Sequence, residues 1–509
     1  MAKNYDVIVV GAGNGGLAAS VASAKQGHST LLIEKNQDPG GAATSFKRGR
    51  FEFEADIHEL AGYGSKENPG PFYQLFQKLG VNISVKPLKD LYRVITDRDG
   101  KLDTTLPTGL KAFSQKMVQE VPSDKEALKH FIDIGLQCTQ AFSAITGDPA
   151  HIDINDLAKK YPALIKYGKK PFATVLKELG LSEKSQKLLS VFWPYKCVPT
   201  DVLDFFEFAA VLFGYITVPP TVMTNLSHDV TTAFIQSLVD SGGEVWFNTE
   251  VTGLIYENGA IKGVKIGDQE IRARQVISDV MPNFVYGKLL KPDQVPQSEV
   301  KKVNAREFMP SCFTVYLGLN KSPEQLGIKD YTIFMSHSGD PRKQFNNLHT
   351  LEHNGHLMMN CQNIADPNCS PKGTTQLFAT QFVDGHVWDN VKPKDYFKLK
   401  NRIASKIIAE YEHMTGIKIQ DSIEEIAVAT PATFARYMGS PEGETLGYEE
   451  PTWDEIISRC FDIKRDEEPI KNLHFVGNSS YTSDGYTFTY MSGVFTANSV
   501  NQELSKEKV

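Results

Sequence analysis

The first forty residues carry the clearest hydrophobic pattern of the chain. Residues 7–10 form an unbroken β-branched run, and a second apolar run at 31–33 ends in the acid Glu34. Continuous runs of this kind are typical of parallel strands that are covered on both faces. Between them, residues 17–24 are small and apolar, which predicts a helix suited to close packing on a sheet. The N-terminus is therefore predicted to form a strand, a turn, a helix and a second strand.

Further along, the pattern alternates between strand and helix periods. Residues 50–56 alternate apolar and polar positions and predict a strand, and 71–79 predict a helix ended by Gly80. From about 91 to 220 the pattern becomes that of amphipathic helices. The other predicted elements are strands at 244–251, 271–277, 312–319, 375–383 and 423–430, a hairpin of 251–255 with 261–266, and helices at 232–241, 397–414 and 492–504.

A glycine fingerprint joins the first strand to the first helix. Gly11, Gly13 and Gly16 have the G-x-G-x-x-G spacing. The first glycine allows the turn, the second lets a pyrophosphate approach the backbone, and the third lets helix and strand pack closely. The free N–H groups and the positive end of the helix dipole then form an anion site made by the backbone. The fingerprint thus predicts a dinucleotide site.

Glu34 and the end of the chain narrow the choice of dinucleotide. A carboxylate at the end of the second strand can accept hydrogen bonds from both hydroxyls of an adenosine ribose, and it repels a 2′-phosphate. This favours FAD or NAD(H) over NADP(H). A late buried strand ends at residues 476–478 before a small-residue helix. Such a helix end beside a flavin favours the anionic reduced ring, so the closing segment suits FAD.

These elements predict an α/β fold in which two domains are interleaved. At 509 residues the chain is too long for a single core. We expect a Rossmann-like FAD-binding domain, with a parallel sheet and a β-meander, and an α+β substrate or lid domain. The predicted FAD-binding domain comprises residues 1–90, 225–290 and 455–505, and the substrate domain comprises 91–224 and 291–454.

Composition excludes some classes of function. The net charge is −7 and no basic block stands out, which argues against nucleic-acid binding. The six cysteines include no C-x-x-C pair, and the first apolar run is short and follows Asp6, unlike an export signal. These features favour a reducing cytoplasm. Residues 205–218 are apolar but too short to span a bilayer. They predict a core helix or pocket wall, with peripheral membrane contact as the alternative.

The motifs resemble the FAD-dependent phytoene desaturase, carotenoid isomerase and retinol saturase group of flavoprotein oxidoreductases. The resemblance rests on the fingerprint with Glu34, on Gly40-Gly41, on the strand at 51–54, on Gly242-Gly243 and on residues 475–477. It implies an FAD enzyme that acts on carbon–carbon bonds of a long apolar carotenoid, retinoid or other isoprenoid or lipid. The implied reactions are desaturation, saturation or isomerisation, with hydride taken or given at flavin N5. The electron donor or acceptor stays open among oxygen, a quinone and NAD(P)H.

Two departures from the group concern the ligands. Asn478 stands where the group usually has Asp, although an amide oxygen can accept the same hydrogen bond. Residues 218–225 replace a Pro-x-Gly-Gly stretch. The proton-handling candidates, assigned by position, are His58, Glu54 and Tyr448; a structural role for His58 is the alternative. The expected cofactor-binding residues are Gly11, Gly13, Asn14, Gly15, Gly16, Glu34, Lys35, Gly40, Gly41, Ala42, Val251, Gly477 and Asn478.

Other groups of residues in the sequence give weaker indications of a functional site. His349, His353 and His356 have helical spacing, but Asn354-Gly355 breaks the helix, so we expect no metal site there. Cys197 is expected to be a buried thiol. The aromatic side chains between 205 and 215 are expected to line an apolar tunnel. Two alternatives stay open: an amine-oxidase-like flavoenzyme with a small aromatic cage for an amine, and a non-catalytic flavin- or lipid-binding protein.

Overall fold

The computed structural model describes residues 4–56, 59–147, 152–451, 453–455, 459, 469–479 and 485–506. Its first sheet is parallel at the centre, where strands β18, β12, β1, β2 and β9 lie side by side in that order. Their bounds are Leu473–Phe475, Gln269–Ser278, Asn4–Val10, Thr30–Ile33 and Glu244–Trp246. The strands β10 (Gly253–Glu257) and β11 (Ala260–Ile266) add an antiparallel meander to β12. The predicted α/β class with a Rossmann-like parallel sheet is confirmed.

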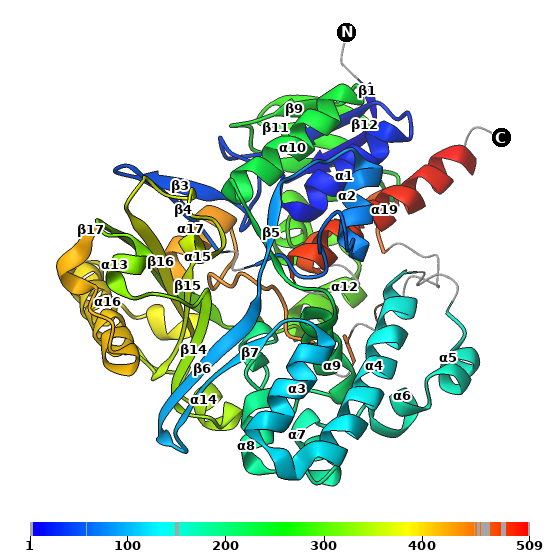
Figure 1. The fold of residues 1–509 in the computed structure, drawn as a ribbon. Helices are drawn as coiled ribbons and strands as arrows, with labels where there is room; N and C mark the ends of the chain where they lie inside the picture. The colour runs from blue at the N-terminus through cyan, green and yellow to red at the C-terminus, as the bar shows by residue number, and fades with distance from the viewer. Residues whose placement is uncertain are drawn as a thin grey trace.

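Helices α1 (Asn14–Lys25), α2 (Pro71–Leu79), α10 (Leu226–Asp240) and α19 (Tyr486–Lys506) pack beside this sheet. Figure 1 shows α19, near the C-terminus, running alongside α1. A Cβ atom at Gly493 of α19 would lie only 2.2 Å from the carbonyl oxygen of Gly15. The two helices therefore meet backbone to backbone, which only glycine permits.

Some predicted elements differ from the structure in length, among them the helix predicted at 232–241, which begins at Leu226. The strand predicted at 244–251 ends at Trp246, because Asn248 adopts φ 50° and turns the chain. The hairpin turn is confirmed, and its central residues Asn258 and Gly259 both have positive φ, 52° and 81°, as a type I′ turn requires. The last helix begins at Tyr486, earlier than the predicted residue 492.

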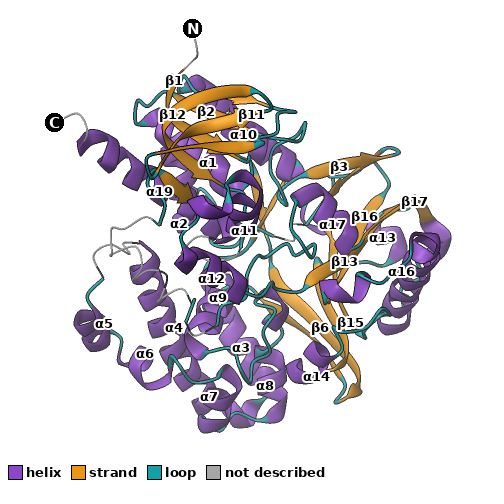
Figure 2. Ribbon diagram, turned by 180° about the vertical axis from the view of Figure 1, so that it is seen from behind, coloured by secondary structure: helices purple, strands orange, loops and turns teal. Residues whose placement is uncertain are grey.

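A second sheet has the strand order β17-β13-β16-β15-β14-β6-β7, in which only β14 and β6 are parallel neighbours. Its strands, in that order, are Ile423–Ala429, Ser311–Leu319, Thr375–Val383, His356–Cys361, Thr332–Ser338, Asp90–Asp99 and Leu102–Pro107. Helix α16 (Pro393–Thr415) covers one face of this sheet through Ile403, Ile407 and Tyr411. Figure 2 shows the first sheet and the second sheet as separate layers.

A group of helices covers the other face of the second sheet (Figures 1 and 2). They are α3 (Leu110–Glu120), α4 (Lys125–Gly147), α5 (Ile154–Lys160), α6 (Pro162–Tyr167), α7 (Phe172–Glu178), α8 (Glu183–Leu189) and α9 (Phe205–Thr217). Helix α9 is the apolar segment of the sequence, and its buried face confirms the prediction of a core helix. Within the described ranges, no helix is both long and apolar enough to cross a membrane.

Shorter elements connect these layers. They are β3 (Ser45–Arg48), β4 (Phe51–Glu54), β5 (Val85–Pro87), β8 (Thr221–Met223), α11 (Pro282–Phe284), α12 (Gln297–Ala305), α13 (Pro323–Leu326), α14 (Pro341–Asn346), α15 (Gln362–Ala365) and α17 (Pro431–Met438). The first sheet draws its strands from residues 4–33, 244–278 and 473–475, and the second from 90–107, 311–383 and 423–429. The exact domain boundaries stay a prediction.

Candidate functional site

The parallel strands of the first sheet end at one edge, and the predicted cofactor residues gather there. The glycine loop 11–16 follows β1, Glu34 follows β2, Asp279 follows β12, and Gly477 lies just beyond β18. In open α/β sheets, dinucleotides bind at the carboxyl ends of the strands. This edge, made by the loop 11–16 with Glu34 and Gly477, is called the cradle below.

The glycines of the cradle stand too close to other atoms for any side chain. A Cβ at Gly15 would lie 2.5 Å from the backbone nitrogen of Gly477, and one at Gly16 would lie 2.0 Å from the carbonyl oxygen of Gly11. Gly11 itself has φ 95°, in the region that favours glycine. The loop can therefore offer backbone N–H groups to a ligand at the start of α1, where the helix dipole favours an anion.

The segment after β2 lies against the glycine loop. The Gly40 N–H donates to the carbonyl oxygen of Ala12 at 2.7 Å, and Gly40 forms an isolated bridge with Gly13. Gly40 and Gly41 have φ 122° and 61°, so both use conformations that other residues rarely adopt. Ala42 follows on this segment. The fold thus brings residues 40–42 against the glycine fingerprint, although they follow it by more than twenty positions in the sequence.

Glu34 is buried beside the glycine loop. Its Oε2 accepts a hydrogen bond from the Ala12 N–H and its Oε1 accepts one from the Asn36 N–H, each at 2.8 Å. A carboxylate has further lone pairs, so it can still accept ribose hydroxyls. The side-chain oxygen of Asn14 is buried and has no hydrogen-bond partner. A donor from a ligand would satisfy this oxygen, so the residues present fit a dinucleotide.

The remaining predicted cofactor residues lie around the cradle. Lys35 is exposed, and its Nζ would be 2.9 Å from a Cβ at Gly439. Val251 is buried with the strands of the first sheet. The Gly477 N–H donates to the Ser492 hydroxyl at 2.9 Å. Asn478 contacts the late loop, because its Cγ would lie 2.8 Å from a Cβ at Gly447.

Asp279 is a residue of the cradle that sequence analysis missed. Its Oδ2 would be 2.3 Å from a Cβ at Gly13, so the carboxyl group lies directly on the glycine loop. Burial raises the pKa of Asp279 to about 8, and the nearby charge of Glu34 adds to the rise, against hydrogen bonds from the Gly16 and Gly13 backbone. A signal existed in the sequence: an acid directly follows the strand predicted at 271–277.

A cavity of about 440 Å³ lies beside the cradle. One wall is a single face of α9, because the lining positions 207, 210, 211, 214 and 215 recur at helical spacing. The opposite face of α9 packs into the core, where Phe205, Phe208 and Phe213 are fully buried. The predicted aromatic tunnel is therefore wrong for these phenylalanines, and Tyr215 alone among the five expected aromatic residues lines the cavity.

Helix α19 connects the cavity to the cradle. Its first turns line the cavity through Tyr486, Phe488 and Met491, and Gly493 then packs against α1. The end of α4 forms another wall, with Phe142 and Thr146. Most of the lining surface is apolar. Helix α19 therefore extends from the cavity wall to the glycine loop.

Four carboxylic acids line this cavity, and two of them, Glu207 and Glu450, lie 3.8 and 2.6 Å from the Lys196 ammonium. The other two are Glu59 and Asp56. The Tyr195 hydroxyl donates to Oε1 of Glu59 at 2.8 Å, whereas Oε2 is buried and has no hydrogen-bond partner. Burial raises the pKa of Glu59 to about 7, although hydrogen bonds from Tyr195 and Tyr215 lower it. Burial also raises the pKa of Asp56 to about 7. Both groups can therefore exchange protons near neutral pH.

Two of the three proton-handling candidates chosen from sequence, Glu54 and Tyr448, lie outside the cavity lining. Glu54 is fully buried, but its Oε2 accepts the Ser227 N–H at 2.8 Å, so the carboxyl group faces the start of α10. Burial raises the pKa of Glu54 to about 8. Tyr448 stacks on Phe308 and its hydroxyl donates to Asn283 at 3.3 Å. Neither residue lines the cavity. His58 lies outside the described residues.

The three histidines and the cysteine considered from sequence make contacts within the protein framework. His349 and His353 lie in the loop before β15, and His356 begins that strand, so the three do not share a helical face. The Nδ1 atom of His349 pairs with Asp384 and that of His353 with Gln381. Cys197 is buried, as predicted, and its thiol donates to the Pro194 carbonyl.

Comparisons with known proteins agree with this architecture. Residues 9–79 match the model of the NAD(P)-binding Rossmann-like domain. Prolycopene isomerase from Daucus carota is 24% identical, over 99% of this chain and 81% of its own length. All-trans-retinol 13,14-reductase from Danio rerio is 24% identical (93% and 82%). 4,4′-Diapophytoene desaturase from Methylomonas sp is 23% identical (98% and 96%). These named relatives are enzymes.

Solved structures add the fold. Putrescine oxidase bound to putrescine superposes with a TM-score of 0.65 over 99% of both chains, at 13% identity. At this identity the likeness speaks for the fold alone, so the amine-oxidase alternative gains no support from it. The relatives that match in sequence are instead an isomerase, a reductase and a desaturase, and the resemblance deduced from the motifs is confirmed. The chain fits the desaturase, isomerase and saturase group of oxidoreductases, with a Rossmann-like dinucleotide-binding domain.

Proposed function

We propose that this protein is an FAD-dependent oxidoreductase that desaturates, saturates or isomerises carbon–carbon bonds of a long apolar carotenoid, retinoid or other isoprenoid or lipid. The observation that carries the proposal is the course of α19. This helix lines the apolar cavity with Tyr486 and Met491 and then packs on the dinucleotide cradle through Gly493. Because α19 reaches both, we infer that the cavity and the cradle form one site, and the relatives named above support the class of substrate.

The cradle supplies the contacts that FAD needs. The backbone of the glycine loop and the N-terminus of α1 would bind the pyrophosphate, and Glu34 would accept the ribose hydroxyls. Gly477 and Asn478 would contact the ribitol and flavin end. The other residues proposed to bind FAD are Asn14, Lys35, Gly40, Gly41, Ala42 and Val251. Bound FAD would supply hydride transfer at flavin N5.

The chain itself contributes orientation and protons. The small face of α9 leaves room for an apolar chain beside Gly214, and the apolar walls exclude water from it. Adding or removing hydrogen across a carbon–carbon bond also moves a proton. We propose that Glu59, with Tyr195 on its Oε1, holds that proton at its unpaired Oε2, and that Asp56 assists. The roles of His58, Glu54 and Tyr448 stay predictions from sequence position.

A long substrate needs an entrance. A second hollow, beside α4, shares Thr139, Ser143 and Thr217 with the cavity. We propose that the apolar chain enters between the end of α4 and the end of α9. Cytoplasmic location and peripheral contact with a membrane that supplies the lipid stay predictions.

The proposal can be tested by closing the cavity without touching the cradle. Gly214 lines the cavity and a Cβ there would meet nothing within 4 Å, so Gly214→Phe places a ring in the cavity. We expect this variant to retain its FAD and to lose binding and conversion of a polyene, measured by absorbance and by product mass. Gly287, an exposed helical glycine with equally open surroundings, provides the matched control Gly287→Phe.

Three outcomes would change the conclusion. Failure of the wild type to take up FAD would contradict the cofactor assignment. Equal polyene binding by Gly214→Phe and the wild type would contradict the cavity as substrate site. Tight polyene binding without chemical change, under both oxidising and reducing conditions, would favour the non-catalytic lipid-binding alternative.

A further inference from the structure

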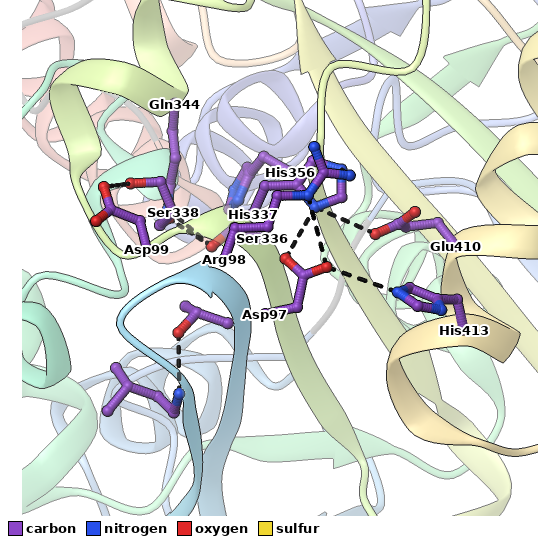
Figure 3. A network of polar contacts seen from close by, with 12 residues as sticks. Asp97, Arg98, Asp99, Ser336, His337, Ser338, Gln344, His356, Glu410 and His413 are labelled. Atoms are coloured by element: carbon purple, nitrogen blue, oxygen red, sulfur yellow. Dashed lines mark hydrogen bonds and ion pairs between the residues drawn. The ribbon is translucent and has the colours of Figure 1, made fainter.

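A mixed cluster of histidines and carboxylates lies on the second sheet, away from the cradle and the cavity. Asp97 comes from β6, His337 from β14, and Glu410 and His413 from α16. Figure 3 shows these four side chains pointing toward one another from their three elements. They are called the α16 cluster below. No residue of this cluster takes part in the function proposed above.

The distances within the α16 cluster are short. The Nδ1 atom of His337 is 3.0 Å from Oδ1 of Asp97 and 3.5 Å from Oε1 of Glu410. The Nε2 atom of His413 is 3.6 Å from Oδ2 of Asp97. The ligand atoms of Asp97, His337 and Glu410 all lie within 4.8 Å of one another. These three side chains therefore already converge on one small volume.

These separations match the requirements of a tetrahedral metal ion. Zinc binds nitrogen and oxygen ligands at ~2.0–2.2 Å, which places neighbouring ligands of a tetrahedron roughly 3.3–3.6 Å apart. Only small movements are needed to close the cluster on an ion, and His413, whose side chain is 68% exposed, is free to rotate. We propose that Asp97, His337, Glu410 and His413 form a binding site for a divalent transition-metal ion of the zinc type.

One carboxylate oxygen of the cluster lacks a hydrogen-bond donor, although it lies 3.5 Å from His337 Nδ1. Oε1 of Glu410 is buried, yet it has no hydrogen-bond partner, and it points at His337. A buried carboxylate oxygen without a donor is costly, and a cation would satisfy it. The ring nitrogen of His337 that ligates an ion must be unprotonated.

The ligand set selects the kind of ion. Two imidazoles with two carboxylates suit zinc and its first-row neighbours, whereas magnesium and calcium prefer six or more oxygen ligands. The other cluster of similar compactness in the described residues, Asp204, Glu207 and Glu455, is purely acidic and already contains the cation Lys169, 3.2 Å from Asp204. That cluster therefore carries no metal proposal.

Arg98 competes with an ion at the α16 cluster. Its NH2 group contacts Nε2 of His337 at 3.2 Å, and its Nε lies 3.8 Å from Asp97. The Arg98 side chain is 68% exposed, so it can swing into solvent at little cost. Its removal should strengthen metal binding, because a like charge near the ion disappears. If these histidines and carboxylates form ion pairs only and bind no metal, removing Arg98 should produce no gain in metal affinity.

The test is a metal titration of the whole chain. Protein stripped with a chelator is titrated with ZnCl2 by calorimetry, and with MgCl2 for comparison. We expect one zinc ion per chain, no comparable magnesium binding, and a rise in Tm of about 2 °C or more at saturation. Arg98→Ala should bind zinc more tightly than the wild type.

Variants then assign the site. His337→Ala should weaken zinc binding by roughly 100-fold or more, since even the loss of an outer partner costs about 10- to 100-fold. His413→Ala, at an exposed position that tolerates substitution, provides a second variant and should weaken binding as well. The matched control is His349→Ala, which removes an exposed histidine paired with Asp384 outside the cluster and should leave the affinity unchanged.

Cobalt gives an independent signature. Co²⁺ bound by this set should show the visible d–d bands of a tetrahedral nitrogen and oxygen site without thiolate charge-transfer bands, which excludes the cysteines. The proposal is overturned if zinc does not bind, if His337→Ala and His413→Ala bind it like the wild type, or if thiolate bands appear. FAD uptake is measured on the same samples, so a failure here is distinguishable from a failure of the proposed function.

Discussion

The cradle and the cavity wall are built in opposite ways, although α19 joins them. The cradle is made mainly of backbone: a Cβ at Gly15 would collide with the Gly477 nitrogen, and the carboxyl groups on the loop are those of Glu34 and Asp279. The cavity wall is made of side chains from distant parts of the chain, including Glu59, Phe142 and Tyr486. Backbone sites need glycines at fixed spacing, and side-chain sites need only the right shape and polarity.

This difference explains how substrate can vary while the cofactor stays the same. A change in the glycine loop affects the atoms that hold the dinucleotide, whereas a change at Gly214 or Val211 alters only the space beside it. The names of the relatives reported above describe different reactions and substrates, and each relative is 23–24% identical to this chain. The following changes separate the two regions, from the largest expected effect to the smallest.

Gly15→Val should abolish cofactor binding and leave the cavity intact. The new Cβ would lie 2.5 Å from the Gly477 nitrogen, so the loop and the closing segment must separate. We expect FAD affinity to fall by roughly 100-fold or more, measured by flavin fluorescence. Gly287→Val serves as control, since a Cβ there meets nothing within 4 Å. Full flavin content in Gly15→Val would show that the cradle is not at this edge.

Glu59→Gln should change the pH dependence of stability and spare the cradle. The pKa of Glu59 is raised from 4.5 to about 7 by burial, so the folded state binds more protons between these values. The stability due to this group is present below pH 4.5 and is lost as the pH rises through 7, by up to about 3 kcal/mol.

Glutamine keeps the Tyr195 contact and does not ionise. The Tm of the variant should therefore exceed that of the wild type at pH 8 and approach it at pH 5, measured by calorimetry. Glu183→Gln, whose side chain is 82% exposed, is the control. A difference in Tm that stays constant across this pH range would contradict the buried acid.

Glu34→Ala should weaken the cradle without closing it. The carboxylate is bonded to the Ala12 and Asn36 N–H groups and remains able to accept ribose hydroxyls. Losing these charge-assisted bonds should cost ~1.5–3 kcal/mol of FAD affinity. Titration of the apoprotein with FAD measures this loss. If Glu34→Gln loses as much FAD affinity as Glu34→Ala, the negative charge of Glu34 matters more than its hydrogen-bond geometry.

Asp279→Asn should produce the smallest effect, at the border between the two regions. The pKa of Asp279 is raised to about 8, so its carboxyl group ionises only above that pH and then repels a pyrophosphate on the same glycine loop. Glu34, just after β2, and Tyr490 on α19 are ionisable groups that face it.

The asparagine variant removes this repulsion. We expect equal FAD affinity for variant and wild type at pH 6, and affinity about threefold to tenfold higher for the variant at pH 9. Equilibrium titrations at the two pH values measure this. Identical pH profiles would mean that the Asp279 carboxylate moves away when the dinucleotide binds.

The sequence predicted the first sheet better than the cavity, for a physical reason. The runs at 7–10 and 31–33 are local patterns, and the glycine spacing with Glu34 places the cradle at their ends. Asn248 shortened one predicted strand, because positive φ at an asparagine leaves no periodic signal.

The cavity could not be deduced in the same way. Helix α9 has apolar residues on every side, so its sequence does not show which side faces the cavity. The aromatic positions were expected to line the cavity, whereas mainly the small and polar positions of the helix line it. Asp279 has a weak signal in its place after a predicted strand, whereas Glu59 becomes recognisable only when tertiary contacts bury it beside the cavity. Burial of an acid depends on partners such as Tyr195, far away in the sequence.

The backbone contact between α19 and α1 has a consequence for the order of assembly in the cell. The glycine loop leaves the ribosome first, but Gly477 and Gly493, which complete it, are synthesised more than 450 residues later. A nascent chain therefore lacks part of the proposed dinucleotide site until Gly493 is made, and we expect cofactor binding only after that point. Chains whose synthesis stops before residue 470 would accumulate as colourless polypeptides without bound flavin. Cellular quality control could recognise them by this difference.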